Sequence, residues 1–366
     1  MLEVQKWLRE FNCLDRLKDQ LGIKSTVHED GRVILNYGMI DSPKRHKIVR
    51  ECRGLVLDSK DDWNLVARSF FRFFNLNEIP EETDEFVWEN CNIQHKEDGS
   101  LLVVYYYKGQ WHVNTRASFS TGQVGDNPIT FRELALKAIP ESFWNNANKS
   151  STYVFELCSL YNKIVRTYQT PTVFLLTVFD GLHEIAPNFV DSEARITGVQ
   201  RPQSLRFENI EQVQEYLNIE SNKDKTFEGV VLRDINNLRI KCKNQNYLCL
   251  HRMSNNGSPC SPKNVLPFVL AGELDELFLF FPEVKEYALQ IKAKVDKWQQ
   301  EIDDLWYVWG DIENQKKFAL RVKDHPFSGC LFKARKMSTN PVDEFKNNPN
   351  AILKRLLKRY ENKLFI

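Results

Sequence analysis

Short apolar runs separated by turn residues dominate the chain up to about residue 250. In the run LRIKCKN, apolar and basic residues alternate, and a period of two is typical of a strand with one buried face. Two turns predict hairpins, because Lys108-Gly109 joins LLVVYYY to WHVNT and Asn236-Asn237 joins GVVLRD to LRIKCKN. A helical stretch, FRELALKAI, begins at Phe131. This mixture predicts an α+β fold with mostly antiparallel strands.

A different period begins after about residue 253. Apolar residues between Tyr287 and Trp309 repeat at steps of four and three, which places them on one face of a long helix. The segment HRMSNNGSPCSPKN, from His251, has the Asn, Gly, Ser and Pro content of a linker. We therefore predict two domains, a sheet-containing domain of residues 1–253 and an all-helical domain of residues 254–366.

Composition narrows the class of protein. The 366 residues include 50 Lys and Arg and 49 Asp and Glu, a formal net charge of +1, which excludes a histone-like polycation. With 42% hydrophobic and 12% aromatic residues, the chain can build a core and is not expected to be disordered. The segment 331–366 differs, with nine Lys and Arg against three Asp and Glu. This basic end is either a solvated helix face or a surface that contacts a phosphate backbone.

The cysteines and the N-terminus bear on the compartment. The eight cysteines are spread along the chain without a CxxC pair, so the sequence supports no zinc site and is simplest to understand in a reducing compartment. No stretch approaches the roughly 20 apolar residues that a membrane helix needs. The N-terminal MLEVQKWLREFN predicts an amphipathic helix rather than a signal peptide. We expect a soluble protein of the cytoplasm, or of the host cytoplasm if a virus encodes it, with no membrane partner.

The most informative peptide is HKEDGS, residues 95–100, directly before the strand LLVVYYY. A lysine held at a strand edge, here Lys96, can attack phosphorus once its ammonium group loses a proton. We expect Asp98 to hold the turn or a reacting group, and Gly99 to let a ligand approach the backbone closely. The alternative is an ordinary polar turn between strands.

A second pattern lies at the run EGVVLRD and the strand after it. Alternation places Arg239, Lys241 and Lys243 on one face of LRIKCKN, opposite its apolar residues. Three cations on one face repel each other unless an anion lies over them, and a phosphate chain is the natural candidate. Glu228, which precedes the paired strand, could anchor a divalent metal that bridges phosphate oxygens. The alternative is a solvent-exposed basic face.

Three further charged residues stand in apolar surroundings. Arg53 precedes the run GLVLD, and Arg72 lies among four phenylalanines in FFRFF, where a guanidinium needs an anion or a path to water. Glu156 in YVFEL is a carboxylate on an apolar strand, which is costly to bury without a hydrogen-bonding ligand or a metal. Each of the three could also belong to an ordinary structural ion pair.

As a set, these motifs resemble the covalent nucleotidyltransferases, and within them the phage-type RNA ligase 1 family. The resemblance covers residues 30–252 and rests on motifs in this order: ECRGLVL, FFRFFNLNE, KEDGS, NTRAS, VFELCSLYNKIV, EGVVLR and RIKCKN. The peptides FFNLNE and NKIV favour the RNA ligase 1 group over DNA ligases and capping enzymes. No five-strand OB-fold pattern follows residue 253, which also counts against those two classes.

The resemblance implies a nucleotidyltransferase (adenylation) domain of antiparallel sheets with flanking helices, plus a small all-helical C-terminal domain. It also implies an ATP-dependent RNA ligase that uses Mg²⁺, with Mn²⁺ as the other candidate metal. Lys96 would take AMP from ATP and pass it to the 5′-phosphate of an RNA end. A 3′-hydroxyl would then attack that activated phosphate and release AMP. We expect a monomer that acts on RNA with these ends, with tRNA as a candidate substrate and a separate end-healing enzyme as a candidate partner.

The resemblance also assigns roles to single residues. Lys96, Asp98 and Gly99 form the nucleophile turn, and Glu228 holds the metal. The residues implied in nucleotide binding are Arg53 on the triphosphate, Glu156 on the ribose or in the metal shell, Gly229 beside the metal carboxylate, Lys241 and Lys243 on the α-phosphate, Arg72 as a pyrophosphate clamp, Arg116, and Phe74 as the adenine-stacking aromatic. Arg72 and Arg116 depart from the family pattern, which has lysines there, so their contacts have a different geometry.

Two other functions stay open at this point. One is a DNA or mixed-substrate polynucleotide ligase, because strand choice depends on groove contacts that no motif here reports. The other is a catalytically silent protein that binds RNA ends. The presence of Lys96, Glu228, Lys241 and Lys243 together argues against the second, since RNA binding alone needs no nucleophile and metal carboxylate.

Overall fold

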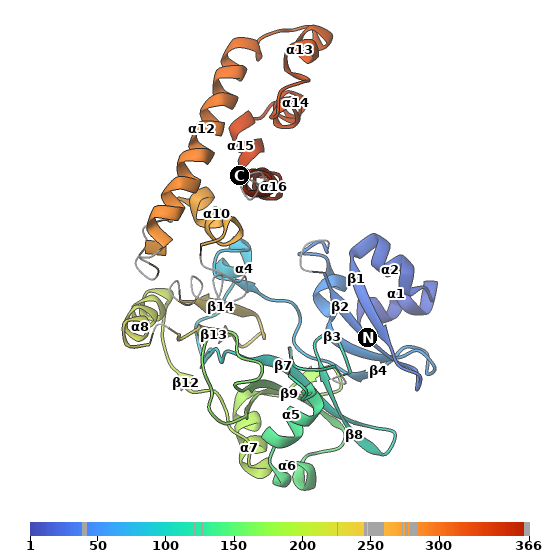
Figure 1. Ribbon diagram of the computed structural model, residues 1–366. Helices are drawn as coiled ribbons and strands as arrows, with labels where there is room; N and C mark the ends of the chain where they lie inside the picture. The colour runs from blue at the N-terminus through green and yellow to red at the C-terminus, as the bar shows by residue number, and fades with distance from the viewer. Residues whose placement is uncertain are drawn as a thin grey trace. The chain divides into compact units, whose positions relative to one another are not determined.

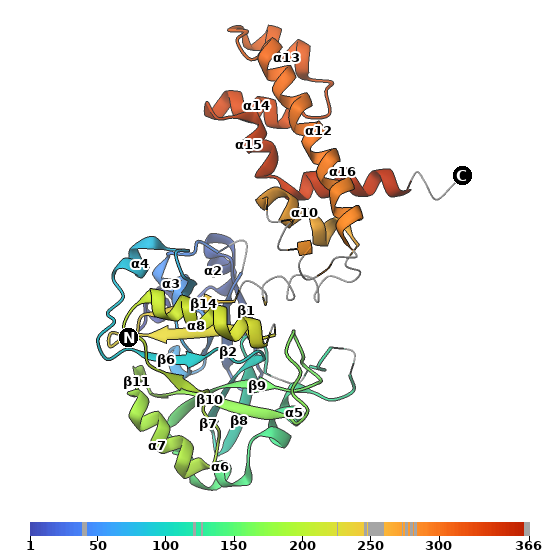
Figure 2. The ribbon, with the colours of Figure 1, turned by 90° about the vertical axis from the view of Figure 1, so that its left-hand side faces the viewer.

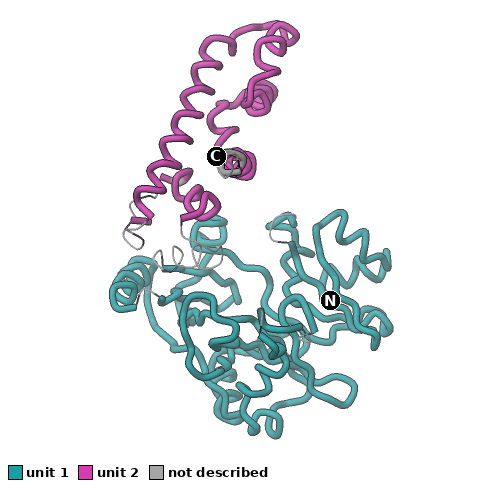
Figure 3. Tube along the Cα trace, viewed as in Figure 1, with its two compact units in different colours: residues 1–247 teal, residues 248–366 magenta. Residues whose placement is uncertain are grey.

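The computed structural model describes residues 1–38, 42–119, 122–125, 127–224, 226–244, 247, 260–272, 274, 277–278, 281 and 284–361. The chain divides into two compact units, Met1–Tyr247 and Leu248–Ile366, which Figure 3 draws in different colours. The domain boundary predicted at residue 253 lies outside the described residues.

A four-stranded antiparallel sheet with the order β1-β2-β3-β4 begins the first unit. Helices α1 and α2 pack against it through a core that includes Leu8, Leu17 and Leu35. The N-terminal amphipathic helix that the sequence predicts is confirmed as α1, whose first turn donates two backbone hydrogen bonds to the Glu51 carboxylate. The elements of this region are α1 (Glu3–Phe11), α2 (Leu14–Leu21), β1 (Ile23–Val27), β2 (Arg32–Tyr37), α3 (Lys47–Glu51), β3 (Arg53–Asp58) and β4 (Asn64–Ala67).

Two five-stranded sheets form the rest of the first unit, with the orders β11-β10-β9-β7-β8 and β12-β6-β13-β14-β5. All named strand pairs in them are antiparallel except β5 with β14, which confirms the predicted α+β class. Both predicted hairpins are confirmed, β7–β8 and β13–β14. The strands are β5 (Phe74–Asn75), β6 (Asn92–His95), β7 (Ser100–Tyr107), β8 (Gln110–Thr115), β9 (Ser151–Cys158), β10 (Thr172–Asp180), β11 (His183–Glu184), β12 (Ser204–Leu205), β13 (Gly229–Arg233) and β14 (Arg239–Lys243).

Helices cover one face of each five-stranded sheet (Figures 1 and 2). Leu134 of α5, Phe143 of α6 and Val190 of α7 share a core with β7, β9 and β10. Val213 and Leu217 of α8 share another core with β6, β13 and β14. The helices of this region are α4 (Pro80–Asp84), α5 (Phe131–Ala138), α6 (Glu141–Asn146), α7 (Pro187–Thr197) and α8 (Ile210–Lys223).

Strand alternation determines what the other two faces of these sheets carry. Because Ile240 and Cys242 of β14 pack toward α8, Arg239, Lys241 and Lys243 point the opposite way, as the sequence predicts. On β9, the neighbours of Glu156 pack toward α5 to α7, so this carboxylate also points away from the helices. The inner faces therefore bring charged side chains from both sheets to one pocket.

The described part of the second unit consists of helices around one core. The predicted long helix is confirmed as α12, which buries Ile291, Val295 and Ile302 on one side. No described helix is long and apolar enough to cross a membrane. The helices are α10 (Pro262–Ala271), α12 (Lys285–Trp309), α13 (Gln315–Val322), α14 (Ser328–Met337), α15 (Pro341–Lys346) and α16 (Pro349–Glu361).

Candidate active site

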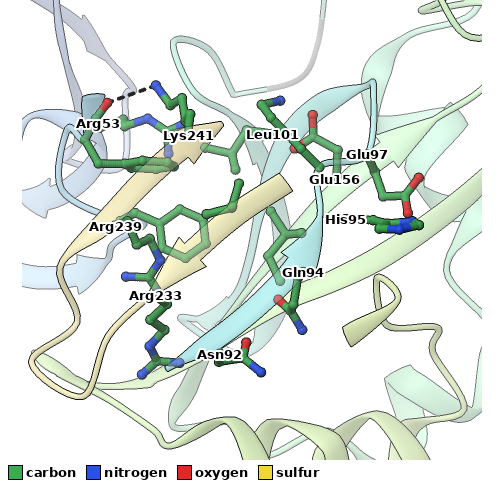
Figure 4. Close-up of a pocket in the computed structure, with 15 residues that line it drawn as sticks. Arg53, Asn92, Gln94, His95, Glu97, Leu101, Glu156, Arg233, Arg239 and Lys241 are labelled. Atoms are coloured by element: carbon green, nitrogen blue, oxygen red, sulfur yellow. Dashed lines mark hydrogen bonds between the residues drawn. The ribbon is translucent and has the colours of Figure 1, made fainter. Parts of the chain in front are cut away.

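The pocket between the inner sheet faces carries charged groups from several strands (Figure 4). Its charged lining includes Lys96 after β6, Glu156 on β9, Arg53 on β3 and Lys241 on β14. Its apolar lining comes from Phe70, Phe73, Leu101, Leu176 and Val231. A cavity with apolar walls and a few convergent polar groups is typical of a small-ligand site. We refer to it below as the nucleotide pocket, after the ligand that the sequence resemblance implies.

Lys96 is held at both its backbone and its side chain. Its backbone N–H donates to the Gly229 carbonyl at 2.8 Å, which ties the nucleophile turn to β13. Its Nζ lies 2.8 Å from Glu228 Oε2. Burial alone would lower the pKa of Lys96, but Glu228 and Glu156 outweigh it, so the pKa is raised. Without a bound nucleotide, the Lys96 amine is therefore protonated and is held in position by Glu228.

Glu228, the residue directly before β13, bridges two lysines. One carboxylate oxygen contacts Lys96, and the other lies 2.9 Å from Lys243 Nζ. Burial would raise the pKa of Glu228, but the charges of Lys96 and Lys243 outweigh it and lower the pKa. A carboxylate that is only 4% exposed is thus kept ionised by two cations.

Lys241 differs from Lys243, the other lysine of β14, because no described carboxylate forms an ion pair with Lys241. Its Nζ donates to the Phe73 carbonyl at 2.9 Å. Burial, reinforced by the charges of Arg53 and Lys96, lowers its pKa to about 7. An anion placed against Lys241 would restore its charge, which makes this residue a natural phosphate contact.

Nucleotide binding at pH 8 is expected to take up about one proton through Lys241. At this pH the residue is mostly neutral in the free protein, because its pKa is about 7. A bound phosphate chain favours the charged form and raises that pKa. Glu156 also has a pKa of about 7 and would take up a proton too if the phosphate chain raised its pKa, so a control variant at Lys241 is needed to assign the proton. Calorimetric titration with a nucleoside triphosphate in two buffers of different ionisation enthalpy measures the uptake.

Lys241→Arg is the matched control for this uptake. Arginine stays charged at pH 8, so the variant has no proton to gain at this position. It is expected to bind the nucleotide without taking up a proton. An uptake equal to that of the wild type would assign the proton to another group.

Glu156 is the second carboxylate at the pocket. Burial raises its pKa to about 7, with Lys96 opposing the rise and the negative charge of Glu228 adding to it. Two carboxylates that repel each other next to a phosphate site fit a divalent cation, which prefers carboxylate and phosphate oxygens. Among the described residues no group of three or more His, Cys, Asp or Glu side chains could hold a metal, so the protein would supply Glu228 and Glu156 and the ligand the rest.

Three arginines gather around a tyrosine that the motifs did not single out. The guanidinium of Arg72 lies 4.2 Å, and that of Arg116 5.4 Å, from the ring centroid of Tyr37, and Tyr37 also interacts with Arg53. Among the residues that the structure describes, the buried Nη1 atoms of Arg53 and Arg72 have no hydrogen-bond partner. Buried, unsatisfied guanidinium atoms beside a phosphate site indicate positions for further anionic oxygens. No sequence signal marks Tyr37, because it ends an apolar strand.

Asp98 and Gly99 have structural functions in the nucleophile turn. The Asp98 carboxylate accepts hydrogen bonds from the backbone N–H groups of Val165 and Arg166 and from the Tyr247 hydroxyl. It holds the turn, one of the two functions expected of it. At Gly99 an added Cβ would lie 2.2 Å from the Leu157 carbonyl oxygen, so this glycine permits close packing against β9, and its expected contact with a ligand stays a prediction.

The prediction that Phe74 is the adenine-stacking aromatic needs correction. Its ring is buried and lies under the Arg50 and Arg72 guanidinium groups, and Phe74 does not line the nucleotide pocket. The pocket aromatics are instead its neighbours Phe70 and Phe73. A run of four phenylalanines does not reveal which ring faces the pocket, because the chain there leaves the regular alternation of a strand.

Arg239 does not need an external anion, in contrast to the expectation for all three cations of β14. The carboxylate of Glu184 on β11 forms an ion pair with it and also lies 3.5 Å from Arg233. Lys243 has its own partner in Glu228, which leaves Lys241 as the cation of this face without a described ion pair. The phosphate prediction therefore rests mainly on Lys241.

The chain is similar in sequence to RNA ligases. A family model described as RNA ligase, of the phage T4 RNA ligase 1 type, matches residues 51–248. A protein of Autographa californica nuclear polyhedrosis virus named as a bifunctional polynucleotide kinase/RNA ligase is 30% identical, over 91% of this chain and 49% of its own length. An RNA ligase of Rhodothermus phage RM378 is 22% identical, over 77% of this chain and 80% of its own length.

The structure is also similar to a solved one. A protein from Aquifex aeolicus named as an ATP-dependent DNA ligase superposes with a TM-score of 0.51 and 13% identity, covering 79% of each chain. At this identity the likeness shows a shared fold. The chain spans about half the length of the polyhedrosis virus relative.

Proposed function

The chain belongs to the RNA ligase family of the phage T4 RNA ligase 1 type, and from that premise we propose that it is an ATP-dependent RNA ligase. It would join the 5′-phosphate and 3′-hydroxyl ends of RNA through a lysyl-AMP intermediate. The observation that carries this proposal is the position of Lys96, which contacts Glu228 and lines the same pocket as Lys241 and Glu156. Nucleotidyl transfer needs a nucleophile, a cation that contacts the phosphate, and carboxylates that can hold a metal ion.

In the proposed first step, Lys96 forms a bond to the α-phosphorus of ATP. Its amine gives up one proton to solvent before attack, since the ammonium has no free electron pair. The P–N bond forms as the bond to the bridging oxygen of pyrophosphate breaks, and the nitrogen then loses a second proton. Glu228 keeps the amine in place until the nucleotide arrives, because it holds Lys96 at 2.8 Å.

The remaining chain atoms neutralise and orient the nucleotide. Lys241 and Lys243 would contact the α-phosphate, and Arg53, Arg72 and Arg116 the β- and γ-phosphates around Tyr37. Glu156 would bind the ribose or complete the metal shell. A divalent cation held by Glu228, Mg²⁺ or Mn²⁺, supplies further neutralisation of phosphate charge when bound. Such positioning and charge neutralisation account for most of the catalysis of phosphoryl transfer.

The later steps use the stored AMP. The 5′-phosphate oxygen of an RNA end attacks the phosphorus of lysyl-AMP, which breaks the P–N bond and returns the amine. A 3′-hydroxyl then attacks the activated 5′-phosphate, forms the phosphodiester and releases AMP.

We assign adenylation to a domain of residues 1–253 and selection of RNA, with tRNA as the candidate substrate, to residues 254–366. The helical character of the second part and its basic C-terminal segment support this assignment. We expect a monomer that works with a separate end-healing enzyme. The polyhedrosis virus relative is named for a kinase as well as a ligase, which supports an end-healing activity that works together with RNA sealing.

The test follows AMP from ATP to RNA. The full chain, freed of bound AMP with pyrophosphate, is incubated with ATP and Mg²⁺ and its intact mass is measured; one adenylate adduct is expected. Addition of 5′-phosphorylated RNA should remove the adduct and yield sealed RNA, with matched DNA strands as the comparison for the polynucleotide ligase alternative. A folded protein that forms no adduct would contradict the proposal and favour an RNA-end-binding function.

A further inference from the structure

A second pocket adjoins the nucleotide pocket, and of its lining residues only Arg72 has been given a role in ATP binding above. The two share Phe70, Phe73 and Arg239 as a common wall. The second pocket is bounded by the segment between β4 and β5, the turn between β10 and β11, and the β13–β14 hairpin. A ligand bound there would lie directly beside an adenylate bound in the first pocket.

The second pocket is strongly basic. Four arginines line it, Arg50, Arg68, Arg72 and Arg239, and Glu184 is its acidic lining residue. Arg239 is neutralised by Glu184, and Arg50 by Glu82, which lies 2.5 Å away. Arg68 and Arg72 are 7% and 4% exposed and form no ion pair with any residue that the structure describes. The charges of Glu184 and Glu51 act on Arg68 without forming an ion pair with it, so these two buried guanidinium groups can still bind an anion such as phosphate.

An open aromatic ring lies at the same pocket. Phe71 is 40% exposed, which is unusual for a residue in the run FFRFF, whose other phenylalanines are more buried. The Arg68 guanidinium lies 4.3 Å from the centroid of Phe71 and 4.6 Å from that of Phe179, so it is stacked between a surface ring and a core ring. Arg68 also donates to the Leu182 carbonyl at 2.9 Å. These contacts hold Phe71 next to a fixed cation with part of the ring open to solvent.

Polar groups suited to nucleotide edges complete the rim. His183 on β11 and Asn236 on the β13–β14 hairpin are exposed there. Single-stranded nucleic acids are bound by aromatic rings that stack on bases and by cations that follow the backbone. RNA readers add side-chain hydrogen bonds to unstacked bases and 2′-hydroxyls.

We propose that the second pocket binds a terminal nucleotide of single-stranded RNA, with its base on Phe71 and its phosphate near Arg68. This inference rests on the proposed ligase function and names a part of its substrate site. The nucleotide belongs either to the 5′-phosphate donor or to the 3′-hydroxyl acceptor. Both strands must bring an end to the adenylate, and the shared wall of the two pockets satisfies this requirement for either one.

The decisive variant is Phe71→Ala, studied in the full chain. Loss of one base-stacking contact is expected to raise the KM for RNA about tenfold. In the donor arm, the concentration of 5′-phosphorylated single-stranded RNA is varied and RNA adenylylation is measured. In the acceptor arm, pre-adenylated RNA is supplied without ATP and the concentration of the 3′-hydroxyl strand is varied. The arm in which KM rises identifies the end that occupies the pocket.

Two further variants separate stacking from a general loss of structure. Phe71→Trp keeps an aromatic face and should restore the KM. Phe189→Ala removes a ring that is 62% exposed on α7, away from both pockets, and should leave every step unchanged. An unchanged KM in both arms for Phe71→Ala would overturn the proposal.

A binding measurement keeps this test independent of catalysis. Anisotropy of a fluorescently labelled single-stranded RNA reports binding whether or not the protein ligates. Absence of lysyl-AMP in the wild type would contradict the ligase function, whereas weaker RNA binding by Phe71→Ala would still support the pocket. Equal RNA binding by wild type and Phe71→Ala would count against the pocket even if ligation proceeds.

Discussion

Lysyl-AMP is expected to be absent from Lys96→Ala under conditions in which the wild type is fully adenylylated. Lys243 also contacts Glu228, but it lies on β14 and does not line the nucleotide pocket, so we do not expect it to replace the lost nitrogen. Removal of the nucleophile eliminates the first step rather than slowing it. Intact mass after incubation with ATP and Mg²⁺ measures the result, and an adduct on the variant would assign the nucleophile to another residue.

Two comparisons separate the nucleophile from the charge of Lys96. Lys96→Arg keeps a cation beside Glu228 but cannot lose its proton, so it is expected to remain folded and to form no adduct. Lys96→Ala leaves Glu228 paired with Lys243, so its free energy of unfolding should stay close to that of the wild type. It should also seal pre-adenylated RNA without ATP, because that substrate already carries the activated phosphate. If Lys96→Arg does not fold, Lys96→Ala is strongly destabilised and pre-adenylated RNA is not sealed, the loss of the adduct would instead indicate a misfolded pocket.

The parts of the site that follow from local periodicity could be predicted from the sequence. Alternation along LRIKCKN placed Lys241 and Lys243 on one face, and the structure has Ile240 and Cys242 buried under α8 on the other. The turn signals at Lys108-Gly109 and Asn236-Asn237 gave both hairpins, since turn chemistry depends on adjacent residues. The helix expected between Tyr287 and Trp309 is present as α12 for the same reason.

Contacts between distant segments could not be predicted in this way. Arg239 and Glu184 are far apart in sequence, and only the pairing of β9, β10 and β11 brings the carboxylate under β14. The same holds for Tyr37, which meets Arg72 and Arg116 across three segments. A single sequence contains the residue types but not these pairings, so the number of cations that need an external anion was overestimated.

Backbone approach is the other feature that residue types conceal. A glycine in a phosphate-binding turn is compatible with a ligand at the backbone and with a neighbouring strand at the backbone. At Gly99 the neighbour is Leu157 on β9, and at Gly229 it is Cys242 on β14. Which of the two functions applies depends on the sheet that forms next to the turn.

Gly229→Ala is expected to destabilise the protein strongly, because it combines backbone strain with a steric clash. Gly229 has φ of +135°, a conformation that residues with a Cβ rarely adopt, and its added Cβ would lie 2.2 Å from the Cys242 carbonyl oxygen. Neither atom belongs to a flexible side chain, so β13 and β14 would have to separate. We expect the free energy of unfolding to fall by on the order of 3 kcal/mol.

The same substitution should also impair lysyl-AMP formation in the molecules that remain folded, because the Gly229 carbonyl holds the Lys96 backbone and Gly229 pairs with Lys243. Gly109→Ala is the matched control: its φ is +89° but nothing lies within 4 Å of the added Cβ. That variant should lose about 1 to 2 kcal/mol from backbone strain alone and keep lysyl-AMP formation. Urea unfolding and adduct mass measure both effects. Equal behaviour of the two variants would mean that close approach of β13 and β14 does not position the nucleophile, and that glycine is required at residue 229 for its φ alone.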